Sequence, residues 1–414
     1  MSSNPNSLTS HHVRLLAVLA LINFVNFAAR LVFVPLIPLL REHLQATDAQ
    51  LGELQTWLLV ILAVFSIPFG FLADRFSRKA IIAFGILFWS VATFAGGLVS
   101  SFGAFLVARA FVGLGEAAYA PAAQSMISSA FPFSRRAFAQ SVFASGMLLG
   151  GAAGQVIGGL MGPRYGWQAA FFVVGLAGIL PAFALTGLDD PPRGPCSEVV
   201  PVFRLLGVPA FVTMLFAGMC ITFSSVSFIT WGIDFVVNYK DFSLREASVS
   251  LSIIALSSAV LGVLCGGWIA DQLQKRLAYG RIIAIASAFL LAAPFLLLAI
   301  QSDEKRILLL SLFVAGFFMS WYHGPVTAVL HDMMPKRAHA TSVGVYMFAT
   351  QLIGGLGPQV VGKISDLQDM QLGLQISVAV MVLGALLLLL VIHFIRRDGL
   401  RHRNLEIFHV ETGD

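Results

Sequence analysis

Long apolar runs separated by short polar stretches dominate the chain. Twelve of these runs are long enough to cross the roughly 30 Å hydrocarbon core of a membrane as α-helices. They lie at about 13–40, 50–73, 79–101, 102–130, 137–162, 167–188, 207–234, 247–271, 279–300, 306–332, 338–362 and 372–396. Only Ser100, Ser101 and Gly103 separate the third run from the fourth, which indicates a tight hairpin. The pattern predicts an all-α membrane protein with twelve transmembrane helices.

Composition excludes a soluble globular protein. Hydrophobic residues make up 57% of the 414 residues and charged residues only 11%, whereas a soluble domain carries about 25% charged residues. The mean hydropathy is +0.85. The three cysteines indicate no disulfide framework. The polar N-terminus, followed by a long run that contains Arg30, does not have the pattern of a cleaved signal peptide.

Basic residues are distributed unequally between the predicted loops. With both termini on the same side, 17 lysines and arginines lie on that side and 7 on the other. In membrane proteins the cytoplasmic loops carry the excess of basic residues. We therefore expect both termini in the cytoplasm and the chain in a bacterial inner membrane. The same asymmetry explains the net charge of +5 without a nucleic-acid partner.

Two sequence echoes indicate that the chain consists of two similar halves. Gly70–Asp74 (GFLAD) is matched by Gly267–Asp271 (GWIAD), and Arg136–Val142 (RAFAQSV) by Arg337–Val343 (RAHATSV), at offsets of 197 and 201 residues. Two similar halves around a midplane site are typical of secondary transporters. We predict cytoplasmic tails at 1–12 and 397–414, pseudo-symmetric six-helix bundles at 13–188 and 207–396, and a proline-rich cytoplasmic linker at 189–206.

Arg109 and Glu116 are the two charged residues of the run 102–130. Their spacing of seven residues is close to two helical turns, so both project from one face, about 10 Å apart along the axis. A charge near the centre of a bilayer costs at least a few kcal/mol, so we expect both side chains to line a wet cavity. A structural ion pair that holds helices together is the alternative interpretation.

The stretch Gly70–Lys79, GFLADRFSRK, resembles the signature G-x-L-a-D-r-x-G-r-[KR] that lies between the second and third helices of the major facilitator superfamily. Ser77 stands where the signature prefers glycine. The resemblance implies the major facilitator fold and a gating motif in which Asp74 rests against the positive end of a helix of the other half. Gly70 is expected to allow close helix contact. The residues expected in the gating motif are Gly70, Asp74, Arg75, Arg78, Lys79 and, in the second half, Asp271.

Arg109–Gly115, RAFVGLG, resembles the fourth-helix signature R-x-x-x-G-x-G of the same superfamily, whose arginine is associated with proton coupling or anion binding. The longer stretch Arg109–Tyr119, together with Asp190–Gly194 (DPPRG), resembles the Spinster-like branch of the superfamily. That branch includes transporters of sphingosine 1-phosphate and lysophospholipids, which implies an amphipathic cargo.

The first predicted helix departs from the pattern of that branch. Spinster-like proteins usually carry an Asp-Arg pair midway along this helix, with the acid implied in proton coupling. Here the pair is Ala29-Arg30. Glu116 is then the clearest acid at mid-membrane depth that could neutralise Arg30 or Arg109. Whether transport is coupled to protons is left open.

Further polar residues within the predicted helices are candidates for substrate contact. Asn23, Asn26 and Arg30 share a face of the first helix, which either lines a cavity or bonds to a neighbouring helix. Ser224, Ser227 and Trp231 share a face of the seventh helix, with the same two interpretations. Asp234 is either a gate residue or a solvated helix end, and His323 either a cavity residue or a packed one. The candidate substrate-binding or coupling residues are Arg30, Arg109, Glu116, Asn26, Tyr119, Ser227, Trp231 and His323.

Sequence motifs for catalysis are missing. The chain has no G-x-x-x-x-G-K-[ST] nucleotide-binding loop, no histidine–cysteine cluster with metal-ligand spacing and no G-x-S-x-G nucleophile elbow. We therefore expect neither an enzyme nor a bound cofactor or metal.

Taken with the resemblance, these features predict a secondary active transporter that works by alternating access. Arg30 and Arg109 are expected to attract the head group of an anionic, lipid-like substrate of lysophospholipid or sphingosine-phosphate type, while Glu116 balances them in the empty state. We expect a monomer surrounded by membrane lipids, with protons as an open second partner. One alternative is a transporter of small organic anions such as sugar acids. Another is a transporter-like receptor that binds without translocation.

Overall fold

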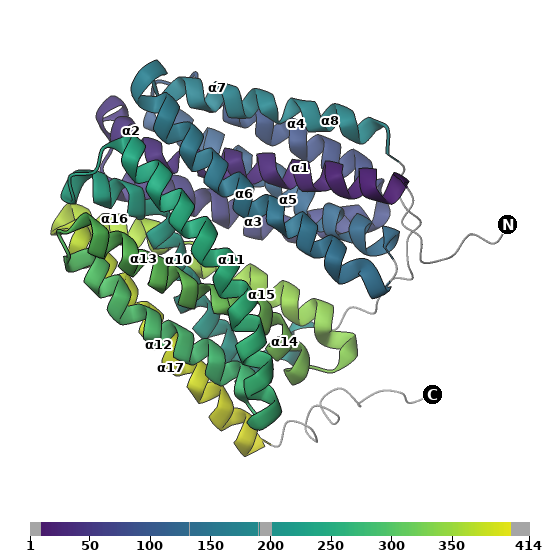
Figure 1. Ribbon diagram of the computed structural model, residues 1–414. Helices are drawn as coiled ribbons and strands as arrows, with labels where there is room; N and C mark the ends of the chain where they lie inside the picture. Colours follow the sequence, from purple (N-terminus) through teal and green to yellow (C-terminus); the bar gives the residue numbers. More distant parts are fainter. Residues whose placement is uncertain (1–9, 132, 189, 191–200, 399–414) are drawn as a thin grey trace. The chain divides into compact units, whose positions relative to one another are not determined.

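The computed structural model describes residues 10–131, 133–188, 190 and 201–398, and these residues are almost entirely helical (Figure 1). Within these ranges the side chains of Ser10, His11, Asp74, Phe133, Ser134, Ala137, Lys336, Ala340 and Asp398 are not described. The first part of the chain forms α1 (Ser10–Leu31), η1 (Val34–Leu36), α2 (Ile37–Leu44), α3 (Asp48–Arg75), α4 (Arg78–Gly96), α5 (Phe102–Ala130), α6 (Phe133–Tyr165), α7 (Trp167–Ala177) and α8 (Ile179–Thr186). The described part of the chain contains no β-strand.

The second part of the chain continues the helical pattern. It forms α9 (Val202–Leu206), α10 (Pro209–Tyr239), α11 (Leu244–Arg276), α12 (Gly280–Gln301), α13 (Lys305–Met319), η2 (Ser320–Tyr322), α14 (His323–Met333), η3 (Lys336–Ala338), α15 (His339–Gly354), α16 (Gly357–Leu367) and α17 (Met370–Asp398). The short helix α9 falls within the predicted linker 189–206, most of which lies outside the described residues, as do nearly all of the predicted tails.

Eleven helical segments of the described chain are long and apolar enough to cross a membrane. They coincide with eleven of the twelve predicted runs. The remaining run, 338–362, folds as α15 and α16, which are separated by Gly355 and Leu356. This run is rich in glycine and carries Gln351 and Gln359, so its apolar character is diluted.

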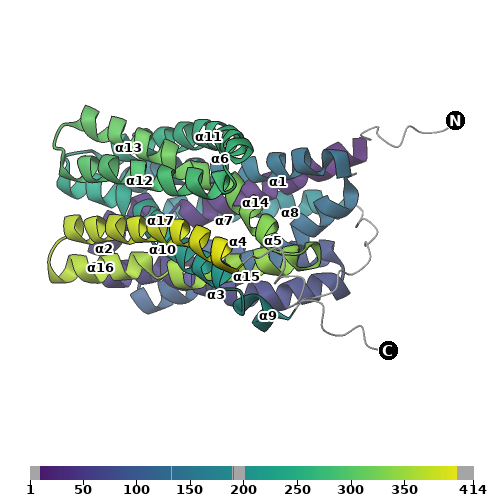
Figure 2. The ribbon, with the colours of Figure 1, turned by 90° about the horizontal axis from the view of Figure 1, so that it is seen from below.

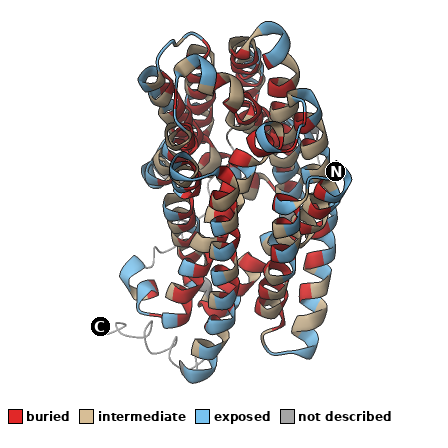
Figure 3. Ribbon diagram, turned by 90° about the vertical axis from the view of Figure 1, so that its left-hand side faces the viewer, coloured by how far each residue is buried: buried red, intermediate tan, exposed pale blue. Residues whose placement is uncertain are grey.

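Exposed residues occur along the helices as well as at their ends (Figure 3), and many of them are large and apolar. Leu180 and Phe183 of α8 and Leu264 and Trp268 of α11 are examples. Exposing this much apolar surface to water is unfavourable, whereas the hydrocarbon core of a bilayer solvates it. The helices therefore belong to a multi-pass integral membrane protein.

Contacts divide the chain into two compact units. The first unit contains residues Met1–Pro195 together with Thr230–Ser252, and the second contains Cys196–Ile229 together with Ile253–Asp414. Helices α10 and α11 therefore each contribute residues to both units. The two units are described separately below.

In the first unit, α5 packs along α3 and α4, and α1 packs along α6 (Figure 1). Glycine permits the contact between α1 and α6. Gly146, Gly150, Gly154 and Gly158 recur every four residues of α6. A Cβ at the first three would overlap the backbone of α1, and one at Gly158 would overlap the backbone of Val32 just beyond α1. The glycines of α6 therefore allow its backbone to approach that of α1 closely.

In the second unit, α12 packs along α13 and α17, and α16 lies beside α17 (Figure 2). Gly218 of α10 is placed where a Cβ would collide with the ring of Tyr346 in α15, and Gly357 of α16 lies against the backbone of Phe223 in α10. Close helix packing through glycine is therefore common to both units.

Local sequence explains where the first helix is interrupted. Pro35 has no N–H to continue the hydrogen bonding of α1, which ends at Leu31 and is followed by the short helix η1. The next helix, α3, begins with a capping box in which the Thr47 side chain accepts from the Gln50 amide and the Gln50 side chain accepts from the Thr47 amide. The break after Leu31 places freed backbone carbonyls within the membrane-spanning region.

Candidate functional site

Arg30 and Glu116 form a buried ion pair between α1 and α5. Arg30 Nε donates to Glu116 Oε2 at 2.9 Å, and Arg30 Nη2 donates to the same oxygen. The Arg30 side chain is 13% exposed, whereas the Glu116 side chain is 1% exposed. The sequence left open whether Glu116 pairs with Arg30 or with Arg109. In the structure its ion-pair partner is Arg30.

Arg109 uses its guanidinium to hold the interrupted end of α1. Its Nη2 donates to the Arg30 carbonyl at 3.1 Å and to Gln55 Oε1 at 3.3 Å, and its Nη1 lies 3.5 Å from the Ala29 carbonyl. The guanidinium carbon also lies 4.3 Å from the ring centroid of Phe33. The last carbonyls of a helix have no partner within it, and lipid offers no water to replace one. Arg109 therefore stabilises the backbone that carries Arg30.

The predicted wet cavity along the Arg109–Glu116 face is wrong. Arg109 and Glu116 are each 1% exposed, because α1 and α3 pack directly on this part of α5. The glycines of the R-x-x-x-G-x-G stretch allow that packing. A Cβ at Gly113 would overlap the backbone of Leu58 in α3, and one at Gly115 would lie 2.7 Å from the backbone nitrogen of Trp89 in α4.

Three buried polar atoms of this cluster have no hydrogen-bond partner among the described residues. They are Glu116 Oε1, Asn26 Nδ2 and Arg109 Nε. Arg30 lies one turn beyond Asn26 on α1, so the Asn26 amide is on the same face as the ion pair. An unpaired buried polar group costs about 1–3 kcal/mol. The cluster therefore retains an acceptor and two donors that a ligand, a proton or water can satisfy.

Other predicted residues on α1 and α5 are bonded to backbone. Asn23 Nδ2 donates to the Phe143 carbonyl at 2.8 Å, which ties α1 to α6. The Tyr119 hydroxyl donates to the Leu19 carbonyl at 3.3 Å, and Tyr119 is 1% exposed. Both contacts position α1, so Tyr119 acts on the cluster through the position of α1.

The remaining predicted substrate residues lie on other elements. Ser227 is buried in α10, and its hydroxyl donates to the Phe223 carbonyl at 2.7 Å. Trp231 is fully buried in the portion of α10 that belongs to the first unit. His323 begins α14 in the second unit and is exposed. The Arg30–Glu116–Arg109 cluster is formed without these three residues.

Three residues of the predicted gating motif, Arg78, Lys79 and Asp271, form bonds within their own units. Arg78 is 1% exposed, and it donates to Asp190 from its backbone N–H at 2.9 Å and from Nε at 2.8 Å. Lys79 Nζ donates to the Leu188 carbonyl just beyond α8 at 2.8 Å. In the second unit Asp271 accepts from Arg281 Nη2 at 2.9 Å, and Arg281 also reaches Asp332.

The predictions for Gly70, Arg75 and Asp74 have different outcomes. A Cβ at Gly70 would meet no described atom within 4 Å, so the predicted close helix contact at this glycine is wrong. Arg75 is exposed at the end of α3. The Asp74 side chain lies outside the described part of the structure, so its predicted latch stays a prediction.

Sequence reasoning missed Gln55, which is 3% exposed in α3 and accepts from Arg109. It is a polar residue near the start of the run 50–73, beside Glu53 and Thr56, so the sequence alone did not single it out. Sequence reasoning also left Asp234 undecided between a gate and a solvated end. Asp234 is 1% exposed and is bonded to Arg41 through both carboxylate oxygens.

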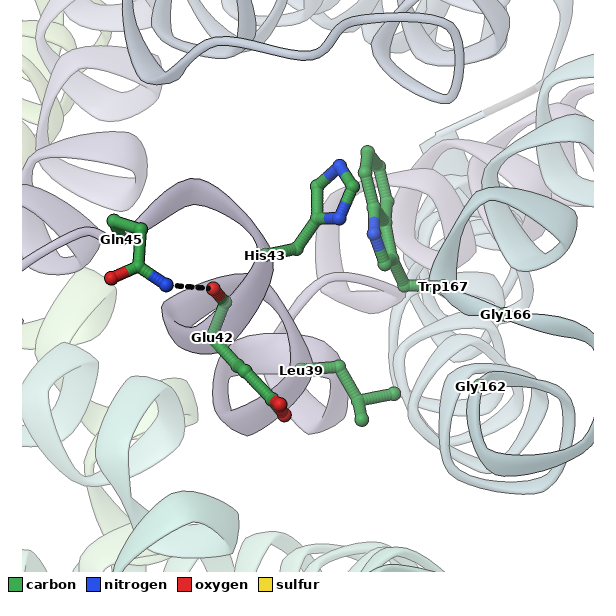
Figure 4. Close-up of a pocket in the computed structure, with 7 residues that line it drawn as sticks. All are labelled: Leu39, Glu42, His43, Gln45, Gly162, Gly166 and Trp167. Carbon is green, nitrogen blue, oxygen red and sulfur yellow. Dashed lines mark hydrogen bonds between the residues drawn. The ribbon is translucent and has the colours of Figure 1, made fainter.

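A pocket of about 500 Å³ lies near the end of α2 (Figure 4). It is lined by Leu39, Glu42, His43, Gln45, Gly162, Gly166 and Trp167. The His43 ring faces the indole of Trp167 with centroids 5.4 Å apart, and Gln45 donates to the Glu42 carbonyl. None of the predicted site residues is among these lining residues, so the pocket is separate from the cluster around Arg30.

A family model and two known proteins match most of the chain. The family model described as Major Facilitator Superfamily matches residues 19–358 and 278–406. An MFS-type efflux pump of Mycolicibacterium smegmatis is 27% identical over 382 residues, which covers 90% of this chain and 88% of that protein. Protein spinster homolog 1 of Homo sapiens is 25% identical over 385 residues, covering 85% of this chain and 72% of that protein.

Solved structures show the same fold. A bacterial homolog to the human lysosomal transporter Spinster, in an inward-facing and occupied conformation, matches with a TM-score of 0.85 and 22% identity, covering 95% of this chain and 99% of that one. The nucleoside transporter NupG matches with a TM-score of 0.77 at 15% identity over 91% of this chain. At these identities the likeness supports the fold alone.

Proposed function

The chain belongs to the Major Facilitator Superfamily and is Spinster-like, and from this premise we propose that it is a secondary active transporter of an anionic, amphipathic substrate. The two predicted bundles, 13–188 and 207–396, would move relative to one another so that the site faces each side of the membrane in turn. The orientation with both termini in the cytoplasm of a bacterial inner membrane is part of this proposal.

The observation that carries the proposal is the unequal burial of the Arg30–Glu116 pair. Arg30 is the accessible partner, and only one oxygen of Glu116 is engaged. An incoming phosphate or carboxylate offers Arg30 several charge-assisted acceptors and so competes with a single carboxylate oxygen. With Arg109, the cluster has two cations and one anion, which favours a ligand with negative charge.

Aromatic rings beside the two arginines favour a substrate that has an apolar body next to its charged head group. The guanidinium carbon of Arg30 lies 4.5 Å from the ring centroid of Phe27, and Phe33 stacks on Arg109. A lysophospholipid or a sphingoid phosphate has this combination. In this proposal Arg30 binds the head group, Glu116 is the internal competitor, and Arg109 and Tyr119 position α1. Asn26 contributes its unpartnered amide, and Ser227, Trp231 and His323 remain candidates for contact with the rest of the substrate.

Proton coupling follows from the same competition. A proton transferred to Glu116 would remove its negative charge and weaken its hold on Arg30, which would favour binding of the anionic substrate. Displacement of Glu116 by the substrate would have the same consequence for α1, which biases the conformational equilibrium. The motif residues Arg75, Arg78, Lys79, Asp74 and Asp271 act in gating and do not contact the substrate.

A thermal-shift screen of the purified protein tests this proposal. Lysophosphatidic acid, sphingosine 1-phosphate and a sugar acid such as gluconate are added at two pH values, because a ligand of the folded state raises the apparent melting temperature. We expect stabilisation by the two lipids, lost in Arg30→Gln and retained in Arg164→Gln, which neutralises an exposed arginine of α6. Stabilisation by gluconate alone would replace the lipid substrate with a small organic anion.

Uptake by proteoliposomes tests translocation separately. We expect accumulation of the stabilising compound, and counterflow when the same compound is loaded inside. Specific binding without counterflow would contradict transport and favour a receptor.

A further inference from the structure

Basic side chains gather in the second unit where α17 ends beside the turn between α11 and α12 (Figure 1). Lys275 and Arg276 are in the last turn of α11, and Arg396 and Arg397 are in the last turn of α17. The guanidinium carbon of Arg396 lies 5.3 Å from the ring centroid of Tyr279, which is in the turn after α11. This contact brings the two helix ends together. We call Lys275, Arg276, Arg396 and Arg397 the basic cluster.

The basic cluster has no anionic partner among the side chains that the structure describes. All four members are exposed, and none forms an ion pair with a described carboxylate. Two acids of the same region, Asp271 and Asp332, are bonded to Arg281 at 2.9 and 2.8 Å. Asp398 follows the cluster in the chain, and its side chain is not described. Its single charge would still leave an excess of positive charge.

The first unit neutralises the basic residues of its corresponding turn from within. The echo between Gly70–Asp74 and Gly267–Asp271 makes the turn between α3 and α4 the counterpart of the turn between α11 and α12. There Arg78 donates to Asp190, which follows the last helix of that half, and Lys79 donates to carbonyls at the end of α8. The last helix of the second half, α17, ends in two arginines instead. An anion from outside the chain is therefore favoured at the basic cluster.

Exposed apolar residues lead along both helices to the cluster. Leu386 and Leu390 of α17 lie four residues apart, and the last arginine of the cluster continues their face seven residues later. Leu264 and Trp268 of α11 have the same spacing, and the cluster lysine follows seven residues later. Surfaces of this kind face the hydrocarbon core of a bilayer, so the cations lie where the core gives way to the lipid head groups.

We propose that the basic cluster binds the head group of an anionic phospholipid, whose acyl chains lie along these two apolar faces. Arginine offers a phosphate paired, charge-assisted hydrogen bonds. Each basic residue close to an anionic membrane surface strengthens the attraction by a factor of about five. The lipid phosphate supplies to the second unit the negative charge that Asp190 supplies to the first.

A membrane lipid fits this surface better than a soluble anion does. The cations are exposed, and dissolved ions screen their attraction for a free anion. The acyl chains of a lipid hold its phosphate at the membrane surface, which raises the effective concentration of phosphate beside the cluster. The cluster belongs to the second unit and shares no residue with the Arg30–Glu116 pair, so this inference does not depend on the identity of the transported substrate.

Native mass spectrometry of the purified full-length protein in detergent tests the lipid site. The dissociation constant of the first bound lipid is measured for phosphatidylglycerol and for phosphatidylcholine with the same acyl chains. We expect the anionic lipid to bind at least tenfold more tightly. The triple variant Lys275→Gln, Arg276→Gln, Arg397→Gln should bind phosphatidylglycerol at least tenfold more weakly and phosphatidylcholine as the parent does. Arg396 is kept because it contacts Tyr279.

A second triple variant controls for the loss of charge alone. Arg164→Gln, Arg245→Gln, Arg306→Gln removes three positive charges from exposed residues whose loops are predicted to lie on the other side of the membrane. It should bind phosphatidylglycerol as tightly as the parent does. Arg397→Gln alone should weaken this binding about fivefold, which keeps the test decisive if the first triple variant does not fold.

Three results would overturn the lipid site. The first is unchanged phosphatidylglycerol binding in both Arg397→Gln and the triple variant of the cluster. The second is an equal loss in the control triple variant. The third is displacement of phosphatidylglycerol by inorganic phosphate at low millimolar concentration, which would assign the cluster to a soluble anion. The measurement includes no transport step, so absence of lysolipid uptake would contradict the proposed function and leave the lipid site intact.

Discussion

Two buried ion pairs of the first unit, Arg41–Asp234 and Arg30–Glu116, differ in how completely their carboxylates are bonded. Asp234 uses both oxygens, accepting twice from Arg41 and once from Asn238. Glu116 accepts both Arg30 donors on one oxygen, and its other oxygen is buried without a partner among the described residues. A fully bonded carboxylate has little to gain from a new ligand, whereas a half-bonded one is poised for exchange. The first arrangement suits a latch and the second suits a substrate site.

Loss of Arg30 is expected to have the largest effect. Arg30→Gln removes the charged partner of Glu116 and leaves a carboxylate in a site that excludes water, so we expect destabilisation of about 3 kcal/mol and at least tenfold slower uptake. Denaturation of the purified protein and lysolipid uptake measure the two effects. Arg164→Gln is the control. A stability within 1 kcal/mol of the parent would show that Glu116 does not depend on Arg30.

The Arg41–Asp234 pair is expected to respond asymmetrically to neutralisation. Arg41→Gln leaves Asp234 buried with only Asn238 as a partner, so we expect a cost of about 2–4 kcal/mol. Asp234→Asn leaves Arg41 paired with Asp48 and partly exposed, so we expect about 1 kcal/mol. Chemical denaturation of both variants and of the double variant measures the order and the coupling. The reverse order would contradict the assignment of Asp234 as the dependent partner.

Gln55 is expected to act on uptake through Arg109. Gln55→Ala removes one acceptor of the Arg109 guanidinium, which we expect to cost about 1 kcal/mol and to reduce uptake moderately. Gln55→Glu keeps an acceptor at the same position and should restore uptake toward the parent value. If both variants transport alike, Gln55 does not position Arg109.

The smallest effect is expected at Lys79. Its ammonium group donates to carbonyls at the end of α8 from a partly exposed position, so Lys79→Met should cost about 0.5 kcal/mol. Arg78→Met, which strips buried bonds to Asp190 and Ser129, should cost several times more. Melting temperatures of the two variants test this ratio, and equal losses would refute it.

Much of the fold could be predicted from the hydrophobic pattern, because a bilayer imposes a minimum apolar length on each helix. The run 102–130 coincides with α5. Predicted boundaries are less accurate where helices continue beyond the apolar stretch. For example, the run 247–271 corresponds to α11, which extends from Leu244 to Arg276. The length of an apolar run reflects the thickness of the hydrocarbon core, whereas capping residues and turns determine where the helix ends.

The candidate site was predicted in part. Charges within apolar runs identified Arg30, Arg109 and Glu116, because such residues are costly in a membrane. Their pairing could not be predicted, since Arg30 and Glu116 are 86 residues apart and the rotation of α1 about its axis decides which arginine reaches the carboxylate. The role of Arg109 at the break in α1 also depends on a helix end that hydropathy does not resolve.

The contrast between the two pairs is tested most directly by measuring the affinity for lysophosphatidic acid. The parent protein, Glu116→Gln and Asp234→Asn are compared as purified proteins at one pH. If Glu116 competes with the substrate for Arg30, Glu116→Gln should bind about tenfold more tightly, because a charged hydrogen bond no longer has to be broken. Asp234→Asn should bind as the parent does. Equal changes in the two variants, or no change in Glu116→Gln, would contradict the account.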